Sequence, residues 1–98
     1  MNTAEVRKIV EEHGQKVVAG KMDRVLSDFT ERGKATAPPV VAELPNPVTS
    51  ADVVGLEQQG SQYIADIRYG GKEKATTVRS TWEDDGGALK IVDVRVVS

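Results

Sequence analysis

Residues 76–97 read TTVRSTWEDDGGALKIVDVRVV, two runs rich in β-branched residues on either side of an Asp/Gly cluster. Asp and Gly tolerate the positive φ angles of tight turns, so this pattern predicts an antiparallel hairpin. Alternate residues of a strand share one face of the sheet. In the first strand we expect the core face to be the one with the only tryptophan, which carries Thr76, Val78, Ser80 and Trp82.

The second strand of this hairpin also alternates, and it therefore presents two different faces. We expect its core face to carry Lys90, Val92, Val94 and Val96. Its outer face then carries Leu89, Ile91, Asp93 and Arg95.

The composition is that of an ordinary globular protein, and 98 residues are enough for one domain over residues 1–98. The net charge of −2, without a cluster of basic residues, argues against nucleic-acid binding. The absence of cysteine excludes disulfides and cysteine-ligated zinc. The N-terminus is polar and no apolar run is long enough to cross a membrane, so we expect a cytoplasmic protein without a membrane partner.

Upstream of the hairpin, helical patterns come first. A helix is expected over residues 3–19, with Thr3 as its N-cap and Gly20 as its stop. A second, shorter helix is expected from Met22 to about Thr30, ended by Gly33.

The segment 34–50 contains all four prolines and is the least regular part of the chain. It can form a short helix that opens at Thr36, but we favour a proline-rich connector. Strands are expected over residues 52–58 and 62–69, with Gly70-Gly71 leading into the hairpin. Helices followed by a meander predict an α+β fold, in which two to three N-terminal helices pack on a curved four-stranded antiparallel sheet to form a cone-shaped roll.

Three stretches resemble the nuclear transport factor 2-like superfamily, which includes ketosteroid isomerases and polyketide-cyclase-like proteins. They are the helical region 5–29 with its Gly20-Lys21-Met22-Asp23 step, the strand VRSTWE at 78–83, and GGALKIV at 86–92. The resemblance implies the same cone-shaped roll, and it implies homodimers that form through the sheet. These motifs belong to the scaffold and say little about activity.

The catalytic residues of the isomerases have no match in this chain. The region that supplies their carboxylate base offers only Glu43 here, the second acid falls at Val78, and the oxyanion-binding tyrosine falls at His13. We therefore carry over no catalytic residue, no metal and no cofactor.

His13 is nevertheless the residue most suited to chemistry, because a histidine can act as acid, base or hydrogen-bond donor near neutral pH. We favour a structural role for it, since catalysis needs a second positioned group. The aromatic residues either fill the core, which we favour, or line a small-molecule pocket together with His13. The candidate pocket residues are His13, Phe29, Tyr63, Tyr69 and Trp82.

Charges alternate in sign on the outer face of the sheet and are mixed there with apolar residues. Such a face suits a two-fold homodimer. The candidate dimer residues are Arg79, Leu89, Ile91, Asp93 and Arg95.

We thus expect a non-catalytic domain that forms homodimers through its sheet and binds a small apolar ligand or a partner protein. One alternative is an isomerase, dehydratase or cyclase that acts on a small hydrophobic carbonyl compound through His13 with Tyr63 or Tyr69. Another is an adaptor that uses only the outer face of the sheet.

Overall fold

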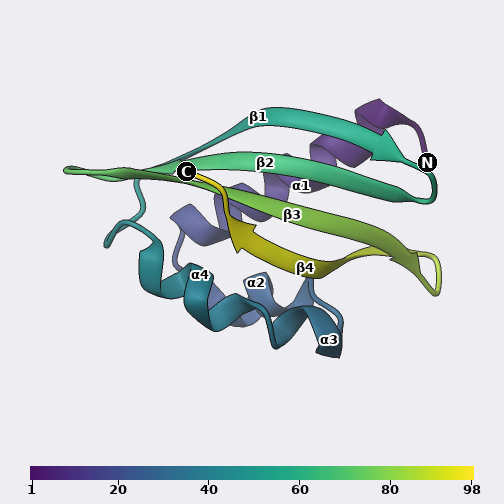
Figure 1. The fold of residues 1–98 in the computed structure, drawn as a ribbon, viewed down its shortest axis with the longest axis horizontal. Coiled ribbons are helices and arrows are strands. Elements are labelled where there is room, and N and C mark those ends of the chain that lie inside the picture. Colours follow the sequence, from purple (N-terminus) through teal and green to yellow (C-terminus); the bar gives the residue numbers. More distant parts are fainter.

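The computed structural model describes residues 1–98 and contains four helices followed by four strands (Figure 1). The elements are α1 (Thr3–Val18), α2 (Met22–Ser27), α3 (Glu31–Lys34), α4 (Ala37–Glu43), β1 (Ser50–Gln59), β2 (Gln62–Gly70), β3 (Ala75–Asp85) and β4 (Ala88–Val96). The α+β fold expected from the sequence is confirmed, with four helices rather than two or three.

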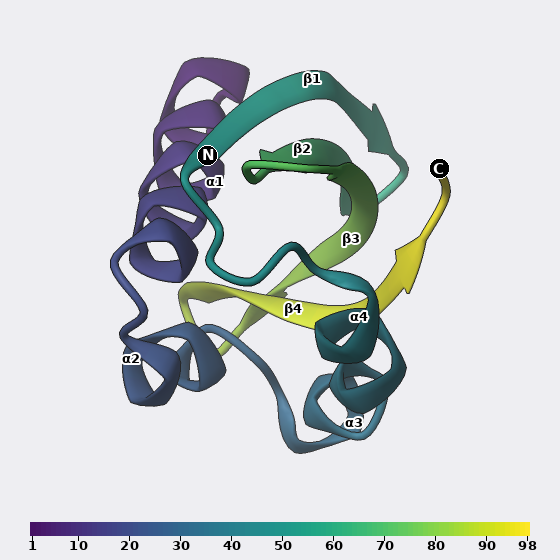
Figure 2. The same ribbon diagram turned by 90° about the vertical axis from the view of Figure 1, so that its left-hand side faces the viewer.

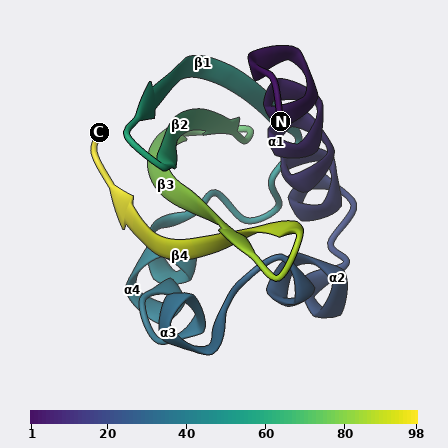
Figure 3. The same cartoon turned by 90° about the vertical axis from the view of Figure 1, so that its right-hand side faces the viewer.

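The strands form one open antiparallel sheet in the order β1-β2-β3-β4. The sheet curves strongly, with α1 beside its concave side and α3 and α4 beside β4 (Figures 2 and 3). The predicted hairpin is present, and its two-residue turn places both Gly86 and Gly87 at positive φ. The expected core face of β3 is also confirmed, because Thr76, Val78, Ser80 and Trp82 are all buried.

A β-bulge corrects the expected faces of β4. Thr81 pairs with Asp93 and Trp82 pairs with Ile91, so Val92 is an extra residue without a partner on β3. The extra residue reverses the alternation, and Leu89 and Ile91 therefore join the core at 8% and 0% exposure. Their expected place on the outer face was wrong.

The burial of the other residues expected on the core face of β4 is only partly confirmed. Val92 and Val94 are buried, as the alternation predicted. Lys90 is only half-buried, and its ammonium group donates a hydrogen bond of 2.6 Å to the carbonyl oxygen of Ser27. Val96, at the end of the strand, is exposed rather than buried.

Helix α1 begins one residue earlier than its expected cap implies. The N-cap is Asn2 rather than Thr3, because the Asn2 side chain accepts a hydrogen bond from the amide of Glu5. Gly20 follows the helix with φ of 72°, which confirms it as the stop. The apolar stripe of α1 enters the core through Val6 and Val10.

The segment after α2 differs most from expectation. Helix α2 ends at Ser27, and Gly33 lies within the separate helix α3, where it packs against the carbonyl group of Ile91. The proline-rich segment is not only a connector, because α4 opens at Thr36 with prolines in its first turn, where they need no amide hydrogen. Val40 of α4 enters the core.

Candidate functional site

His13 lies on the buried side of α1 and is 4% exposed. Its Nδ1 atom is 2.8 Å from the Oδ2 atom of Asp28, which follows the last residue of α2. The ring also contacts Trp82 edge to face, with 5.4 Å between the ring centroids, and lies 6.0 Å from the ring of Phe29. Packing and one hydrogen bond therefore hold the imidazole in a single orientation.

The backbone around Asp28 is fixed against the sheet. The amide of Ile91 donates to the carbonyl oxygen of Asp28 at 2.7 Å, and the amide of Thr30 donates to the carbonyl oxygen of Ile91 at 2.9 Å. Phe29, between them, forms a short parallel bridge with Ile91. This bridge covers part of the free edge of β4 and places the Asp28 carboxylate beside α1.

The Asp28 carboxylate is held by two partners from α1. Besides His13, the ammonium group of Lys16 lies 3.0 Å from Oδ1 and 3.1 Å from Oδ2. Burial acts to raise the pKa of Asp28, but the hydrogen bonds from His13 and Lys16, together with the favourable electrostatic environment beside them, outweigh it and hold the pKa below its ordinary value of 3.8. Asp28 is therefore a carboxylate at neutral pH.

The Asp28→Asn variant should lose stability at neutral pH, by about 1–3 kcal/mol, because the charge-assisted hydrogen bonds weaken. A pKa that is lower in the folded state stabilises the fold above the unfolded pKa, and this contribution disappears as the pH falls through the folded value. The difference between wild type and variant should therefore shrink below a pH of 3.8. Urea unfolding at neutral pH and through the acidic range measures this difference, and one that stays constant with pH would contradict the pairing.

A small cavity lies between α1, α2, α4 and the concave side of the sheet. Its volume is about 50 Å³, and twelve of the thirteen residues that line it are hydrophobic, with His13 as the exception. The lining includes Val17, Met22, Val25, Leu26, Phe29, Val40, Val41, Leu44, Tyr69, Val78 and Val94. The side chains on this side of the sheet thus leave only a small cavity between them.

Two residues that line the cavity each carry a polar group without a hydrogen-bond partner in the protein. Nδ1 is the only ring atom of His13 that makes a hydrogen bond, so Nε2 is unpaired. Tyr69 is 4% exposed, and its hydroxyl group makes no hydrogen bond to another side chain or to the backbone. No completely buried side-chain nitrogen or oxygen lacks a partner, so both unpaired atoms border accessible space. Burial raises the pKa of Tyr69, and its hydroxyl group therefore keeps its proton.

The rim of the cavity is also apolar. Met22 and Leu26 of α2 and Val41 of α4 line the cavity and are exposed to solvent. Large apolar side chains that gather in the open around one hollow are typical of a binding surface. Two short helices, α2 and α4, carry these exposed side chains.

The five residues expected in a pocket separate into two groups. His13, Phe29 and Tyr69 line the cavity, whereas Trp82 lies behind His13 with its Nε1 atom donating to Ser80 at 2.8 Å. Tyr63 lies elsewhere, because its hydroxyl group donates to the carbonyl oxygen of Met1 at 3.1 Å. The pocket role expected of Tyr63 and Trp82 is therefore not supported by their positions.

Sequence reasoning missed Asp28, which is the partner that His13 seemed to lack. A usable signal was present, since His13 and Asp28 lie at similar distances before and after Gly20. Residues at equal distances from the turn between two helices tend to face each other.

The outer face of the sheet is polar. Arg79 makes a two-pronged ion pair with Asp66 on the neighbouring strand, with N···O distances of 2.9 and 3.0 Å, and this pair raises the pKa of Arg79. Asp93 and Arg95 of β4 lie on the same face. One cross-strand ion pair is therefore present, whereas Arg95 lies opposite Arg79 and Asp93 lies opposite Thr81. Leu89 and Ile91 do not contribute to this face.

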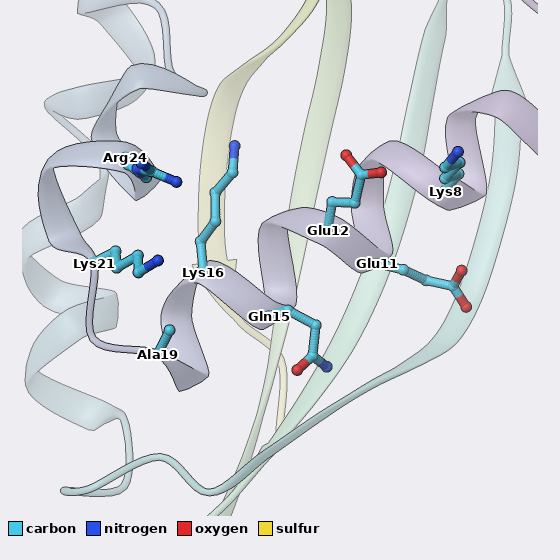
Figure 4. A pocket seen from close by; sticks show the side chains of 8 residues that line it. All are labelled: Lys8, Glu11, Glu12, Gln15, Lys16, Ala19, Lys21 and Arg24. Atoms are coloured by element: carbon cyan, nitrogen blue, oxygen red, sulfur yellow. The ribbon is translucent and has the colours of Figure 1, made fainter.

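A second hollow of about 610 Å³ lies over α1 and α2, and it is open and charged (Figure 4). Lys8, Glu11, Glu12 and Gln15 project from α1, while Lys21 and Arg24 project from the start of α2. Charges of both signs line it, and only one of its eight lining residues is hydrophobic. Such an arrangement is typical of a solvated helix surface.

Comparison of the chain with protein-family models, with curated protein sequences and with solved structures finds no match. No cluster of three or more His, Asp or Glu side chains is arranged to hold a metal ion. None of the helices has the length and apolar character needed to span a membrane.

Proposed function

We propose that this protein binds a small, mainly apolar molecule in the cavity between α2, α4 and the sheet, and that the polar end of the molecule reaches His13 and Tyr69. One observation carries the proposal: His13 and Tyr69, which line an otherwise apolar cavity, each carry a polar group without a partner in the protein. Small-molecule sites typically combine an apolar lining with a few placed polar groups that fix the orientation of the ligand.

The energetics of the two polar groups support a ligand rather than a purely structural role. An unpaired polar group near the core lowers stability unless water or a ligand satisfies it. A cavity of about 50 Å³ can hold ordered water in the free protein, since one water needs roughly 10–15 Å³. A ligand that reproduces these hydrogen bonds and buries apolar surface on the rim would displace this water favourably.

The size of the cavity limits how much of a ligand can enter it. A cavity of roughly 150 Å³ holds a benzene molecule, and the present cavity has about a third of that volume. Only the narrow end of a ligand can therefore enter, and the remainder must lie over the exposed side chains of Met22, Leu26 and Val41. The rim would thus supply most of the apolar contact.

The test uses 1-heptanol and 2-heptanone as probes, titrated into ¹³C-methyl-labelled protein and followed by NMR. We expect at least one probe to shift the methyl signals of Leu26, Val41 and Val17, which line the cavity. The Leu26→Asp variant should bind at least tenfold more weakly, because a charge on the rim opposes apolar contact.

The matched control is Val54→Asp, which places the same charge on an exposed valine of β1, away from the cavity. It should fold and bind both probes as the wild type does. The proposal fails if neither probe shifts the cavity methyl signals, or if Leu26→Asp and Val54→Asp bind equally well.

An isomerase, dehydratase or cyclase that acts on a small hydrophobic carbonyl compound is a second candidate. The Asp28–His13 pair favours it, because a carboxylate that orients an imidazole is the usual support of a general base. Tyr69 would assist in the same cavity, whereas Tyr63 does not line it and its hydroxyl group donates to Met1 instead. The NMR spectra of the probes separate the two functions, since a binding protein returns its ligand unchanged.

We also retain, as a proposal, membership of the nuclear transport factor 2-like superfamily and homodimer formation through the sheet. Helices on a curved, open antiparallel sheet are compatible with that roll. The dimer face now comprises Arg79, Asp93 and Arg95, so contacts across a two-fold axis would be largely ionic. Sedimentation equilibrium should give a dimer that weakens as salt is added, and a monomer at low salt would refute the proposal.

A further inference from the structure

The position of the proton on the His13 ring determines which polar group of a ligand can bind in the cavity. The Asp28 carboxylate is ionised and can only accept hydrogen bonds. The short contact between Nδ1 and Oδ2 therefore requires the proton to be on Nδ1. In the neutral imidazole, the unpaired Nε2 atom is then an acceptor that needs a donor from the ligand.

The other unpaired group has a different requirement. The Tyr69 hydroxyl group keeps its proton and can both donate and accept. Both residues line the same cavity of about 50 Å³. The head that matches them donates to His13 Nε2 and accepts from the Tyr69 hydroxyl group.

We infer that the ligand is an alcohol with a narrow, unbranched end, and that its hydroxyl group donates to His13 and accepts from Tyr69. This inference rests on the proposed function of the cavity as a ligand site. An alcohol has one donor and two acceptor lone pairs, which satisfies both groups at once. An unbranched chain next to the hydroxyl group fits a cavity too small for a ring.

Other polar heads match less well. A ketone accepts from Tyr69 but leaves Nε2 without a donor, and a site built for a donor discriminates against analogues that lack one. A carboxylate brings a negative charge to the acceptor atom Nε2, on the same ring that Asp28 already contacts. An ammonium group can donate, but it would bring a full charge into an apolar cavity.

The test compares 1-heptanol, 2-heptanone and heptanoate at mildly alkaline pH, by titration against the cavity methyl signals. We expect 1-heptanol to bind about tenfold more tightly than either of the others. Its isomer 4-heptanol has the same atoms but is branched at the hydroxyl carbon, so it should bind at least tenfold more weakly than 1-heptanol.

Three variants test the roles of the polar groups. Tyr69→Phe should weaken 1-heptanol binding about three- to tenfold, whereas Tyr63→Phe, the matched control outside the cavity, should leave it unchanged. Asp28→Asn no longer requires the proton on Nδ1, so the preference for 1-heptanol over 2-heptanone should fall towards one. Asp28 thus acts as a positioning residue. If its role were purely structural, the preference for 1-heptanol over 2-heptanone would not change in Asp28→Asn.

The outcomes separate this inference from the function on which it rests. If 2-heptanone or heptanoate binds as tightly as 1-heptanol, and Leu26→Asp still abolishes binding, the cavity is a ligand site but its ligand is not an alcohol. If 1-heptanol and 4-heptanol bind equally tightly, the inference that the ligand has an unbranched end is wrong. If no probe binds, the proposed function itself fails.

Discussion

The Trp82→Ala variant is expected to lower the free energy of unfolding by about 3–5 kcal/mol, the usual cost of truncating a buried aromatic side chain. Trp82 is 0% exposed and lies at the centre of the core. Its removal leaves a large void behind His13 and deprives the Ser80 hydroxyl group of a donor at 2.8 Å. Neighbouring strands cannot close such a void without breaking their hydrogen bonds.

Urea unfolding followed by far-ultraviolet circular dichroism measures this loss, since the variant has no tryptophan to report by fluorescence. Val54→Ala is the control, because Val54 is 59% exposed and its truncation should change stability by less than about 0.5 kcal/mol. A loss below about 1 kcal/mol for Trp82→Ala would mean that this side chain does not organise the core.

The Gly33→Ala variant should destabilise the protein by about 2–3 kcal/mol. Alanine is normally favoured over glycine in a helix by about 1 kcal/mol, so helix propensity alone predicts the opposite sign. A methyl group at this position would collide with the carbonyl oxygen of Ile91 and lie 3.2 Å from the Cα atom of Val92. Helix α3 would have to move away from β4, which would strain the hydrogen bond between Thr30 and Ile91.

Thermal and urea unfolding of the Gly33→Ala variant measure the sign and the size of the change in stability. Gly55→Ala is the matched control, since a methyl group there meets nothing closer than 3.6 Å and the position has no positive φ. It should be neutral or slightly stabilising, because alanine restricts the unfolded chain. A stabilised Gly33→Ala protein would show that α3 does not pack tightly on β4.

Much of the fold follows from patterns that are local in the sequence. The pattern in residues 62–69 predicted a strand, and β2 forms there with Ala65, Ile67 and Tyr69 in the core. Gly20 and the pair Gly86-Gly87 predicted a helix end and a turn, because glycine adopts positive φ without steric cost. Such features depend only on near neighbours, and a single sequence contains all the information they need.

The candidate site was only partly predictable. His13 and Tyr69 were identified as candidates from residue type and periodicity, and they line one cavity. Asp28 was missed because its role depends on how two helices meet. The proline-rich segment was underestimated in the same way, since the contact of Val40 with the core helps to make α4 more than a connector.

The sequence by itself determined the α+β class, the final hairpin and the inward direction of Trp82, because each depends on a repeat of two or 3.6 residues along the chain. Only the tertiary structure decided that Leu89 and Ile91 are buried and that Asp28 orients His13. A bulge is one extra residue whose position depends on the partner strand, and the Asp28 contact joins groups 15 residues apart. The periodicity of the sequence predicts neither the bulge nor the Asp28–His13 contact, because both arise when separate elements pack against each other.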